Sequence, residues 1–337
     1  MSRNVDPIRW KLDRLRGGEV PRCWDVFGGC GGLSLGFHTA GFKIAGSVEL
    51  DAAAAATHAH NFHRDDPRHA VHAQPRDITT REPAELLAAL GIPGDPSCAV
   101  DVLLGGPPCQ AYARVGQAKL REVAKHPTAF LQDSRGRLFE RYLHSVEALR
   151  PLVVVMENVP DVLNYGGQNI AESVCERLNE LGYDCAYTLL NAAFYGVPQL
   201  RERLFLCGWS RQLGAIFEFP KPTHRAELPI GYLNSRSVAL RTLREATGGL
   251  FRDGARYHYV APPPVSPQLP AAVSAREALG DLPAITAHLA GELTRGMRRL
   301  DELVPYPAAD ALPPYARLMR RWPGFAATSA VREHVIR

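Results

Sequence analysis

A single cysteine, Cys109, follows an apolar run and a rigid turn. The run from Val100 to Leu104 ends in two glycines, and Pro107 and Pro108 stand directly before the thiol. Proline fixes the backbone angle φ and removes a hydrogen-bond donor, so the chain that carries Cys109 is stiff. A stiffly held thiol suits a nucleophile, whose angle of attack matters. The alternative is a buried cysteine that packs in a turn.

Two further motifs place polar groups at comparable positions. The run "LVVVMENV" ends with Glu157 and Asn158, and "YGVPQLRERLF" carries Arg201 and Arg203. A carboxyl group in an enclosed site can stay protonated and act as an acid. The two arginines alternate along an extended segment, so they share a face and could bind a phosphate and a carbonyl oxygen. Taken singly, the motifs also fit a carboxylate at a helix N-terminus and a solvated strand edge.

The stretch "DVFGGCGGLSLGF", residues 25–37, carries five glycines between an expected strand and an expected helix. Glycines there let a ligand approach main-chain N–H groups at a helix N-terminus. The spacing differs from the GxGxxG fingerprint, which argues against a nicotinamide cofactor. Glu49 in "SVELD" is placed to bind ribose hydroxyls, and Asp77 in "RDI" could meet an adenine amino group. The alternatives are a flexible turn and two solvated carboxylates.

Five histidines lie within residues 58–72, "HAHNFHRDDPRHAVH". They match no single metal-ligand spacing, and no cysteine stands among them. We therefore predict a solvated helix end and loop, with metal binding as the alternative.

Short β-rich runs alternate with helical stretches over the first two thirds of the chain. The patterns predict seven strands, over residues 23–27, 43–50, 70–72, 100–106, 152–159, 184–192 and 203–209. They predict helices over residues 33–40, 51–60, 84–90, 138–149 and 170–181. This alternation indicates an α/β fold with a doubly wound, seven-stranded mixed sheet. The last two strands have no helix between them and are expected to form an antiparallel hairpin at one edge.

The composition limits the class of protein. The 337 residues are 46% hydrophobic and 22% charged, with a net charge of +4, which fits a globular protein and is compatible with a polyanionic partner. No apolar run approaches the ~20 residues of a membrane helix, and the N-terminus lacks the apolar core of a signal peptide. Seven cysteines are scattered without a CxxC pair, which predicts reduced thiols in a cytoplasm rather than disulfides or a zinc site.

In their order along the chain, the motifs resemble those of the cytosine-5 DNA methyltransferases. They are "DVFGGCGG", "VEL", "RDI", "GGPPCQ", "DSRGRLF", "MENV" and "NAAFYGVPQLRERLF". The resemblance spans about residues 22–224 and continues weakly over 274–283. It implies a Rossmann-like methyltransferase sheet, S-adenosylmethionine as methyl donor and double-stranded DNA as substrate. The cofactor contacts that it implies are Phe27, Gly29, Gly31, Gly32, Leu33, Glu49, Asp77, Ile78 and Pro107.

The resemblance also implies a catalytic chemistry. The Cys109 thiolate would add to C6 of a flipped-out cytosine, while Glu157 holds or protonates N3 and Arg203 steadies O2. Charge would move to C5, which attacks the sulfonium methyl group, and loss of the C5 proton and of the cysteine would restore the ring. Arg201 would share this catalytic face. Ala113 stands where the family usually has a serine.

The segment Ala111–Arg137 would act as a mobile lid that closes over the DNA strand. Its basic residues are Arg114, Lys119, Arg121, Lys125, Arg135 and Arg137.

Proline clusters such as "APPPVSPQLP", residues 261–270, interrupt any period after about residue 220. We expect an N-terminal extension over residues 1–20, the S-adenosylmethionine-binding catalytic domain over 21–225, and a linker with the beginning of a target-recognition region over 226–337.

Complete enzymes of the family continue into a target-recognition region, a further core helix and a late "GN-V-P" segment. This chain ends at "HVIR" without them, so a fragment, a subunit of a split enzyme and a remnant stay open. We expect a bacterial, cytoplasmic, nucleoid-associated DNA methyltransferase of restriction–modification or phage defence, with a second chain as one source of the absent parts. The alternative is a non-catalytic subunit that binds cofactor or DNA. The transfer-RNA branch of the fold ranks lower, because no "CFT" tripeptide is present.

Overall fold

The computed structural model describes residues 6–108, 138–164, 168–230, 258–281, 302–305, 311–320 and 333–336. The chain divides into two compact units. The first unit comprises Met1–Leu190, Glu202–Pro220 and Leu228–Pro262, and the second comprises Asn191–Arg201, Lys221–Glu227 and Pro263–Arg337.

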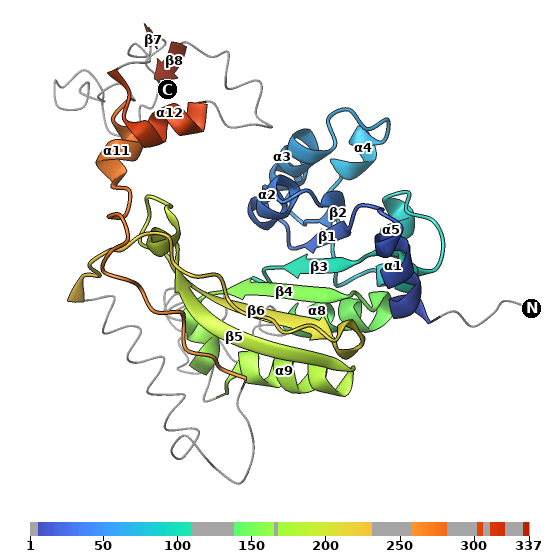
Figure 1. Cartoon of the computed structure of the whole chain (residues 1–337). Helices are drawn as coiled ribbons and strands as arrows, with labels where there is room; N and C mark the ends of the chain where they lie inside the picture. Colours follow the sequence, from blue (N-terminus) through green and yellow to red (C-terminus); the bar gives the residue numbers. More distant parts are fainter. Residues whose placement is uncertain are drawn as a thin grey trace, which may run out of the picture. The chain divides into compact units, whose positions relative to one another are not determined.

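A six-stranded mixed sheet forms the centre of the first unit (Figure 1). Its strands are β1 (Arg22–Val26), β2 (Lys43–Val48), β3 (Val102–Gly105), β4 (Val153–Asn158), β5 (Tyr183–Asn191) and β6 (Glu202–Ser210). The order across the sheet is β2-β1-β3-β4-β6-β5. Strand β1 is parallel to β2 and β3, β3 is parallel to β4, and β6 is antiparallel to β4. The C-terminal ends of β1 to β4 therefore meet along one edge, where α/β sheets bind ligands.

The α/β class and the mixed sheet are confirmed, but the prediction of a strand over residues 70–72 is wrong. These residues belong to the short helix α4 (His69–His72). The backbone closes helical hydrogen bonds there, from the N–H of His72 to the Arg68 carbonyl and from the N–H of Ala73 to the His69 carbonyl. Three residues are too few for a reliable period, and the local hydrogen bonds decide the outcome.

Most helices of the first unit begin where the sequence supplies a cap or a proline. The helices are α1 (Pro7–Arg16), α2 (Gly32–Thr39), α3 (Ala52–Phe62), α4, α5 (Pro83–Ala89), α6 (Pro96–Ala99), α8 (Leu138–Leu149) and α9 (Ile170–Glu180). Asp51 accepts a hydrogen bond from the N–H of Ala54 at the start of α3, and Asn169 accepts one from the N–H of Glu172 at the start of α9. These side chains satisfy donors that the first helical turn leaves unpaired.

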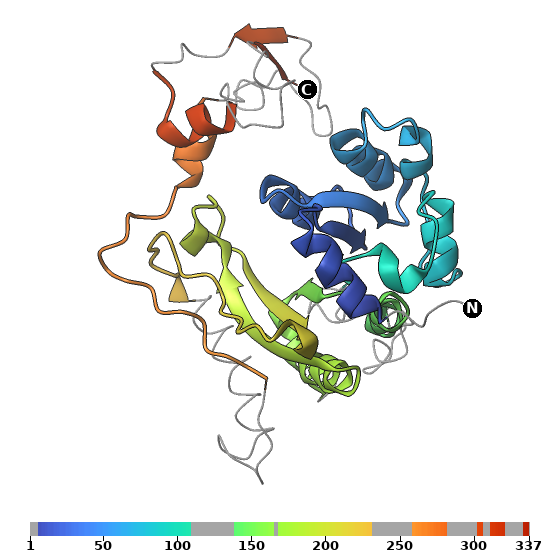
Figure 2. The same cartoon turned by 45° about the vertical axis from the view of Figure 1, so that its right-hand side comes forward.

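Two apolar cores cover the two faces of the sheet. Strand β3 contributes Leu103 to one core and Leu104 to the other, as expected for an apolar run without alternation. Side chains of α5, α8 and α9 belong to the first core, and side chains of α2 and α3 pack against the second. The helices accordingly lie on both sides of the sheet (Figure 2). No helix within the described ranges is both long and apolar enough to span a bilayer.

Helix α1 packs on the first unit through a buried lysine. The Lys11 side chain is fully buried, and its Nζ donates to the carbonyls of Leu149 and Arg150 at 2.9 and 2.7 Å. Burial lowers the pKa of Lys11 to about 7. Lys11 thus satisfies carbonyls that the end of α8 leaves unpaired.

Three short 3₁₀ helices complete the part of the chain up to residue 230 that is described: η3 (Pro160–Asn164), η4 (Ala192–Tyr195) and η5 (Arg211–Leu213). The second unit contains helices α11 (Ala275–Leu279) and α12 (Pro314–Arg320). Its strands β7 (Glu302–Pro305) and β8 (Glu333–Ile336) pair antiparallel. An ion pair between Asp281 and Arg320 links the region after α11 to α12.

Candidate active site

The predicted site residues follow the C-terminal ends of neighbouring strands. The glycine loop, defined as residues 27–32, comes after β1, and Glu49 comes directly after β2. The turn with Gly106 and Pro107 comes after β3, and Glu157 lies at the end of β4. Because β1 to β4 are parallel neighbours, these groups line one edge of the sheet.

The underside of the glycine loop is closely packed. A Cβ atom on Gly28 would lie 2.3 Å from the Ser47 hydroxyl oxygen, and one on Gly31 would lie 2.3 Å from the Phe62 ring. Gly31 also has a φ of 100°, which disfavours any residue with a side chain. These two glycines are therefore required by the fold itself.

The other glycines of the loop leave open space beside the backbone. A Cβ atom on Gly29 or Gly32 would meet no atom within 4 Å. Phe27, before them, holds a left-handed φ of 60°, and its N–H donates to the Val48 carbonyl at 2.8 Å. Such a strained, well-anchored backbone with free space beside it is suited to a ligand that approaches the main chain.

Glu49 is held by main-chain donors on both sides. Its Oε2 accepts from the N–H of Gly29 at 2.9 Å, and its Oε1 accepts from the N–H of Asp51 at 2.8 Å. A carboxylate has about four acceptor positions, so two remain for a ligand. The half-buried Glu49 is thus fixed as a hydrogen-bond acceptor beside the glycine loop.

Asp25 lies buried beneath the same loop. Its Oδ2 accepts from the Ser34 hydroxyl at 2.6 Å, and the Ser34 oxygen lies 3.0 Å from Nε2 of His58. Burial raises the pKa of Asp25 to about 6 and lowers the pKa of His58 to about 4. A chain of buried polar groups therefore supports the start of α2.

The prediction of a solvated histidine cluster is wrong for three of its members. His58, His63 and His72 are buried, and the rings of His63 and His72 stack with centroids 3.7 Å apart. Burial lowers the pKa of His63 to about 3, so its ring is neutral near pH 7. The charged residues around these histidines indicate an exposed segment. The burial of the histidines depends instead on how α3 and α4 pack, which the sequence does not show.

The other predicted cofactor residues are placed by their neighbours. Asp77 Oδ1 accepts from the N–H and the hydroxyl of Thr79 at 2.8 and 2.6 Å. The buried Ile78 is held through its carbonyl, which accepts from Nε of Arg141 on α8 at 2.9 Å. Leu33, on α2, packs against the second core.

Glu157 and Arg203 form an ion pair at the end of β4. Nε of Arg203 lies 3.0 Å from Oε1 of Glu157, and the two side chains are 22% and 25% exposed. A Cβ atom on Gly106 would lie 3.6 Å from Oε2 of Glu157, so the turn after β3 borders this carboxylate. The antiparallel register of β4 and β6 brings the two partners together.

Asn158 holds the turn that leads to Cys109. Its buried amide Nδ2 donates to the Pro107 carbonyl at 3.1 Å, and its Oδ1 accepts from the N–H of Val159 at 2.9 Å. The sequence places Asn158 at this edge but assigns it no role. The signal for this role is a side-chain amide at the end of a buried strand, directly after an acidic residue. Such a buried amide needs hydrogen-bond partners, and a neighbouring turn can supply them.

Two of the predicted elements are not placed by the structure. Cys109 and the segment 111–137 lie outside the described residues. Arg201 is exposed and stands one residue before β6, and its carbonyl accepts from the N–H of Ala192 at 2.9 Å. The structure thus pairs Glu157 with Arg203 within the first unit. Arg201 is assigned to the second unit.

Comparison with known proteins identifies the family. The model of the family described as C-5 cytosine-specific DNA methylase matches residues 22–256. A protein of Oceanobacillus iheyensis whose assigned name is type II methyltransferase M.OihORF3336P is 37% identical over 265 residues, or 79% of this chain and 54% of that protein. Type II methyltransferase M1.HphI of Haemophilus parahaemolyticus is 35% identical over 207 residues, or 61% of this chain and 50% of that protein.

The chain spans about half the length of these two relatives. Among solved structures, a prophage-encoded protein of E. coli described as a DNA modification methyltransferase aligns with a TM-score of 0.45 and 25% identity. That alignment covers 62% of this chain and 56% of the other. The family match extends over more than half of the sequence and contains the strand-end residues described above. The chain therefore belongs to the C-5 cytosine-specific DNA methylase family.

Proposed function

We propose that this chain transfers a methyl group from S-adenosylmethionine to C5 of cytosine in double-stranded DNA. The observation that carries the proposal is the Glu157–Arg203 ion pair, which borders the turn before Cys109. A carboxyl group and a guanidinium group held side by side match the N3 and O2 edge of a cytosine. The family membership supports the same reaction.

The residues after β1 and β2 fit S-adenosylmethionine. The open space beside Gly29 and Gly32 admits a ligand to the main chain. Glu49 keeps acceptor positions for ribose hydroxyls, and the buried Ile78 offers an apolar contact near an adenine ring. Phe27, Gly31, Leu33, Asp77 and Pro107 complete the set that we assign to the cofactor. S-adenosylmethionine supplies an electrophilic methyl group when bound.

In the proposed mechanism the protein activates the cytosine ring through three side chains. The Cys109 thiolate forms a bond to C6, and the ring electrons move toward C5, which makes C5 nucleophilic. Glu157 holds a proton at N3, while Arg203 donates to O2 and keeps Glu157 in place. After the methyl group has joined C5, a base removes the C5 proton, the C6–S bond breaks, and its electron pair returns to sulfur.

The protein's further contribution is to hold the nucleophile and to receive the base. Pro107 and Pro108 stiffen the turn, and Asn158 fixes the Pro107 carbonyl two residues before Cys109. Because the thiol is already held in place, less entropy is lost when it attacks the ring, and the activation free energy is lower. The cytosine must leave the duplex to reach this turn, at a cost of about a few kcal/mol.

We assign the reaction to restriction–modification or phage defence, with the chain acting on DNA in the bacterial cytoplasm. The support is that the two relatives carry the name type II methyltransferase. A second candidate function is a cofactor- or DNA-binding portion without turnover of its own, which needs a second chain for methyl transfer. The observation that favours it is that the glycine loop and Glu49 lie together within the first unit, which could bind the cofactor without the catalytic turn.

One pair of measurements tests the proposal. The full chain is incubated with radiolabelled S-adenosylmethionine and a pool of duplex DNA that contains every short cytosine context. It is also incubated with the same DNA carrying 5-fluorocytosine, whose fluorine cannot leave C5 as a proton does. We expect labelled 5-methylcytosine in the first case and a stable protein–DNA adduct at Cys109 in the second.

Variants separate the two candidate functions. Cys109→Ser should abolish both products, whereas Glu147→Gln on the exposed side of α8 should retain them. Calorimetric binding of S-adenosylmethionine without methyl transfer or adduct, in the presence of ample DNA, would favour the binding portion. Methylation by Cys109→Ser at the unaltered rate would refute the covalent mechanism.

A further inference from the structure

Among the described residues, two groups of side chains bring three candidate metal ligands within 4.8 Å of one another. One group is His63, Asp66 and His72, and the other is Cys175, Cys185 and His258. The rings of His63 and His72 are parallel within 4°, with centroids 3.7 Å apart. A nitrogen lone pair lies in the plane of its ring, so two parallel, stacked rings cannot share one ion at the usual distance of about 2.0–2.1 Å. The first group is therefore a stack of neutral rings.

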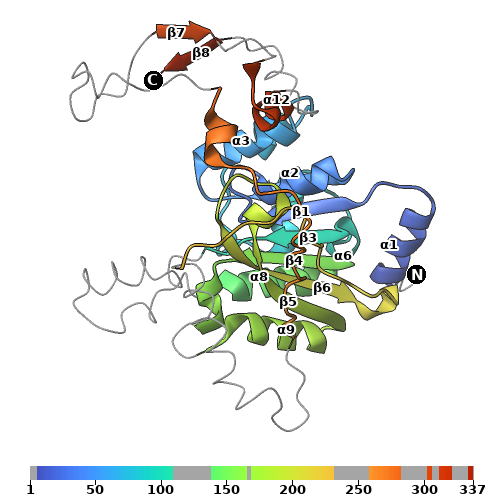
Figure 3. The ribbon, with the colours of Figure 1, turned by 60° about the vertical axis from the view of Figure 1, so that its left-hand side comes forward.

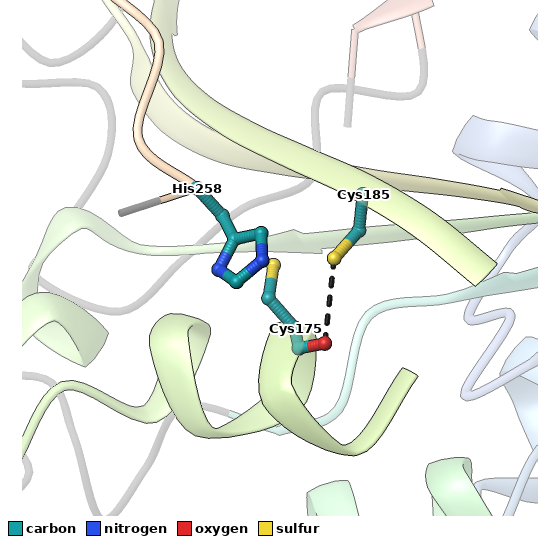
Figure 4. A group of neighbouring side chains, drawn as sticks. All are labelled: Cys175, Cys185 and His258. Carbon is teal, nitrogen blue, oxygen red and sulfur yellow. Dashed lines mark hydrogen bonds between the residues drawn. The ribbon is translucent and has the colours of Figure 1, made fainter. Parts of the chain in front are cut away.

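The second group combines three elements of the first unit (Figure 4). Cys175 lies on α9 and is fully buried, Cys185 lies on β5, and His258 begins the described segment 258–281. Helix α9 runs along β5 in the ribbon view (Figure 3). The two sulfur atoms and the imidazole point into the same space, and Sγ of Cys185 also lies 3.4 Å from the Cys175 carbonyl oxygen.

The imidazole of His258 is oriented by a carboxylate. Nδ1 of His258 donates to Oε1 of Glu172 at 2.6 Å, and Oε2 of Glu172 accepts from the Tyr187 hydroxyl at 2.8 Å. A carboxylate that holds one ring nitrogen fixes the tautomer, so the other nitrogen is available as a ligand. This arrangement of carboxylate, histidine and ion recurs in protein zinc sites.

We propose that Cys175, Cys185 and His258 bind one Zn²⁺ ion. Two thiolates and one imidazole are ligands that zinc prefers, and the two thiolate charges neutralise the ion in a largely buried place. Nε2 of His258 lies 2.6 Å from Nδ2 of Asn179, so in the metal-free chain this amide occupies the lone pair that would bind the ion and must move aside. On metal binding this amide turns its oxygen toward the ion or gives way to a water molecule.

The ion would tie the chain around His258 to the sheet. The N–H of Tyr187 donates to the His258 carbonyl, and the N–H of Val260 donates to the Tyr187 carbonyl, both at 2.9 Å. The family match ends at residue 256, two residues before this junction. The zinc site would thus join α9 and β5 to the segment that follows the family match. It takes no part in the proposed methyl transfer, so the two proposals can fail independently.

The test uses the full chain, purified in a reducing buffer and freed of metal with a chelator. We expect one Zn²⁺ bound per chain by mass spectrometry and a melting temperature that rises with Zn²⁺ concentration. Co²⁺ should give an intense thiolate-to-metal absorption band. Cys185→Ser and His258→Gln should each weaken Zn²⁺ binding at least about a hundredfold, because each removes a ligand.

A graded variant and a matched control sharpen the result. Glu172→Gln keeps all three ligands and should weaken Zn²⁺ binding by about tenfold to a hundredfold. Cys98→Ser removes a cysteine outside the group and should bind Zn²⁺ as the unaltered chain does.

If a ligand variant fails to fold, alkylation of the unaltered chain decides, because Zn²⁺ should protect Cys185 and leave Cys98 reactive. The proposal is overturned if the chain binds no Zn²⁺ or if Cys185→Ser binds it undiminished. Formation of a Cys175–Cys185 disulfide that Zn²⁺ does not prevent would overturn it as well.

Discussion

The two ends of the proposed ligand-binding edge are built differently. At the end formed by β1 and β2, the backbone provides the site, since Glu49 is fixed by the N–H groups of Gly29 and Asp51. At the end formed by β4 and β6, two side chains provide it, since Glu157 and Arg203 hold each other at 3.0 Å. In the proposed function, the first end would present a fixed shape to the cofactor, and the second would present charge to the cytosine ring.

This difference predicts where changes act. The Glu157–Arg203 pair is partly buried, so removal of one charge would leave the other without its partner. Changes there that keep the shape of the side chain should lower activity more than they lower the melting temperature. Changes beneath the glycine loop should instead alter stability or cofactor affinity, because buried groups support that loop.

The largest effect is expected for Glu157→Gln. Glutamine keeps the shape of the side chain but can neither hold the proton at N3 nor pair as an anion with Arg203. The methyl-transfer rate should fall by about a hundredfold to ten-thousandfold, the usual contribution of a positioned acid. The rate is measured with saturating DNA and cofactor, beside the melting temperature. A rate within threefold of the unaltered chain would remove Glu157 from the mechanism.

Replacing the partner should have a smaller effect. Arg203→Lys retains the positive charge but loses the planar fork that can contact Glu157 and a base oxygen together. Loss of a hydrogen bond to a charged group costs about 1.5–3 kcal/mol, so the rate should fall by about tenfold to a hundredfold. Arg201→Lys is the matched comparison, since Arg201 is exposed and stands two residues before Arg203, outside β6. Equal losses in both variants would show that the pair at β4 has no special role.

Much of this site follows from the sequence, because its parts stand directly after apolar runs. The ends of β1, β3 and β4 are visible as runs closed by glycine, proline or a polar residue, and parallel strands bring such ends together. The sequence does not show which of these side chains form ion pairs with one another. The pairing of Glu157 with Arg203 depends on the antiparallel register of β4 and β6, which joins residues far apart in the chain.

The buried polar groups show the same limit. His63 and His72 lie in a sequence rich in charge, yet their rings stack inside the molecule. Cys175, Cys185 and His258 have no recognisable metal-ligand spacing, because a helix, a strand and a distant segment supply them. Periodicity describes one element at a time, whereas these clusters are properties of the packing.

At the cofactor end, Glu49→Gln should weaken S-adenosylmethionine binding. The amide group of glutamine must direct its own donor toward the N–H of Gly29 or of Asp51, so one of the two anchoring hydrogen bonds is lost. The cofactor dissociation constant measured by calorimetry should rise by about tenfold to a hundredfold, equivalent to about 1.4–2.7 kcal/mol. The rate at saturating cofactor should stay close to that of the unaltered chain. A lower saturated rate with unchanged affinity would contradict the assignment of Glu49 to binding.

The smallest expected effect is a change in the pH dependence of the free energy of unfolding when Asp25 is replaced. Its pKa of about 6 in the folded chain exceeds the usual value of about 3.9, so the folded state binds the proton more tightly. The stability contributed by that proton is complete below about pH 4 and is lost as pH rises through 6, by at most about 3 kcal/mol. The buried His58 and His63 have lowered pKa values and act in the opposite direction over the same range.

Asp25→Asn isolates this contribution, because asparagine keeps an oxygen for the Ser34 hydroxyl and carries no charge. Relative to the unaltered chain, the free energy of unfolding of the variant should increase from pH 4 to pH 7, while the histidines contribute equally to both proteins. Denaturant unfolding at several pH values measures this difference. A difference that is independent of pH would mean that Asp25 is ionised in the folded chain throughout the range, and that its carboxylate supports the glycine loop as an anion.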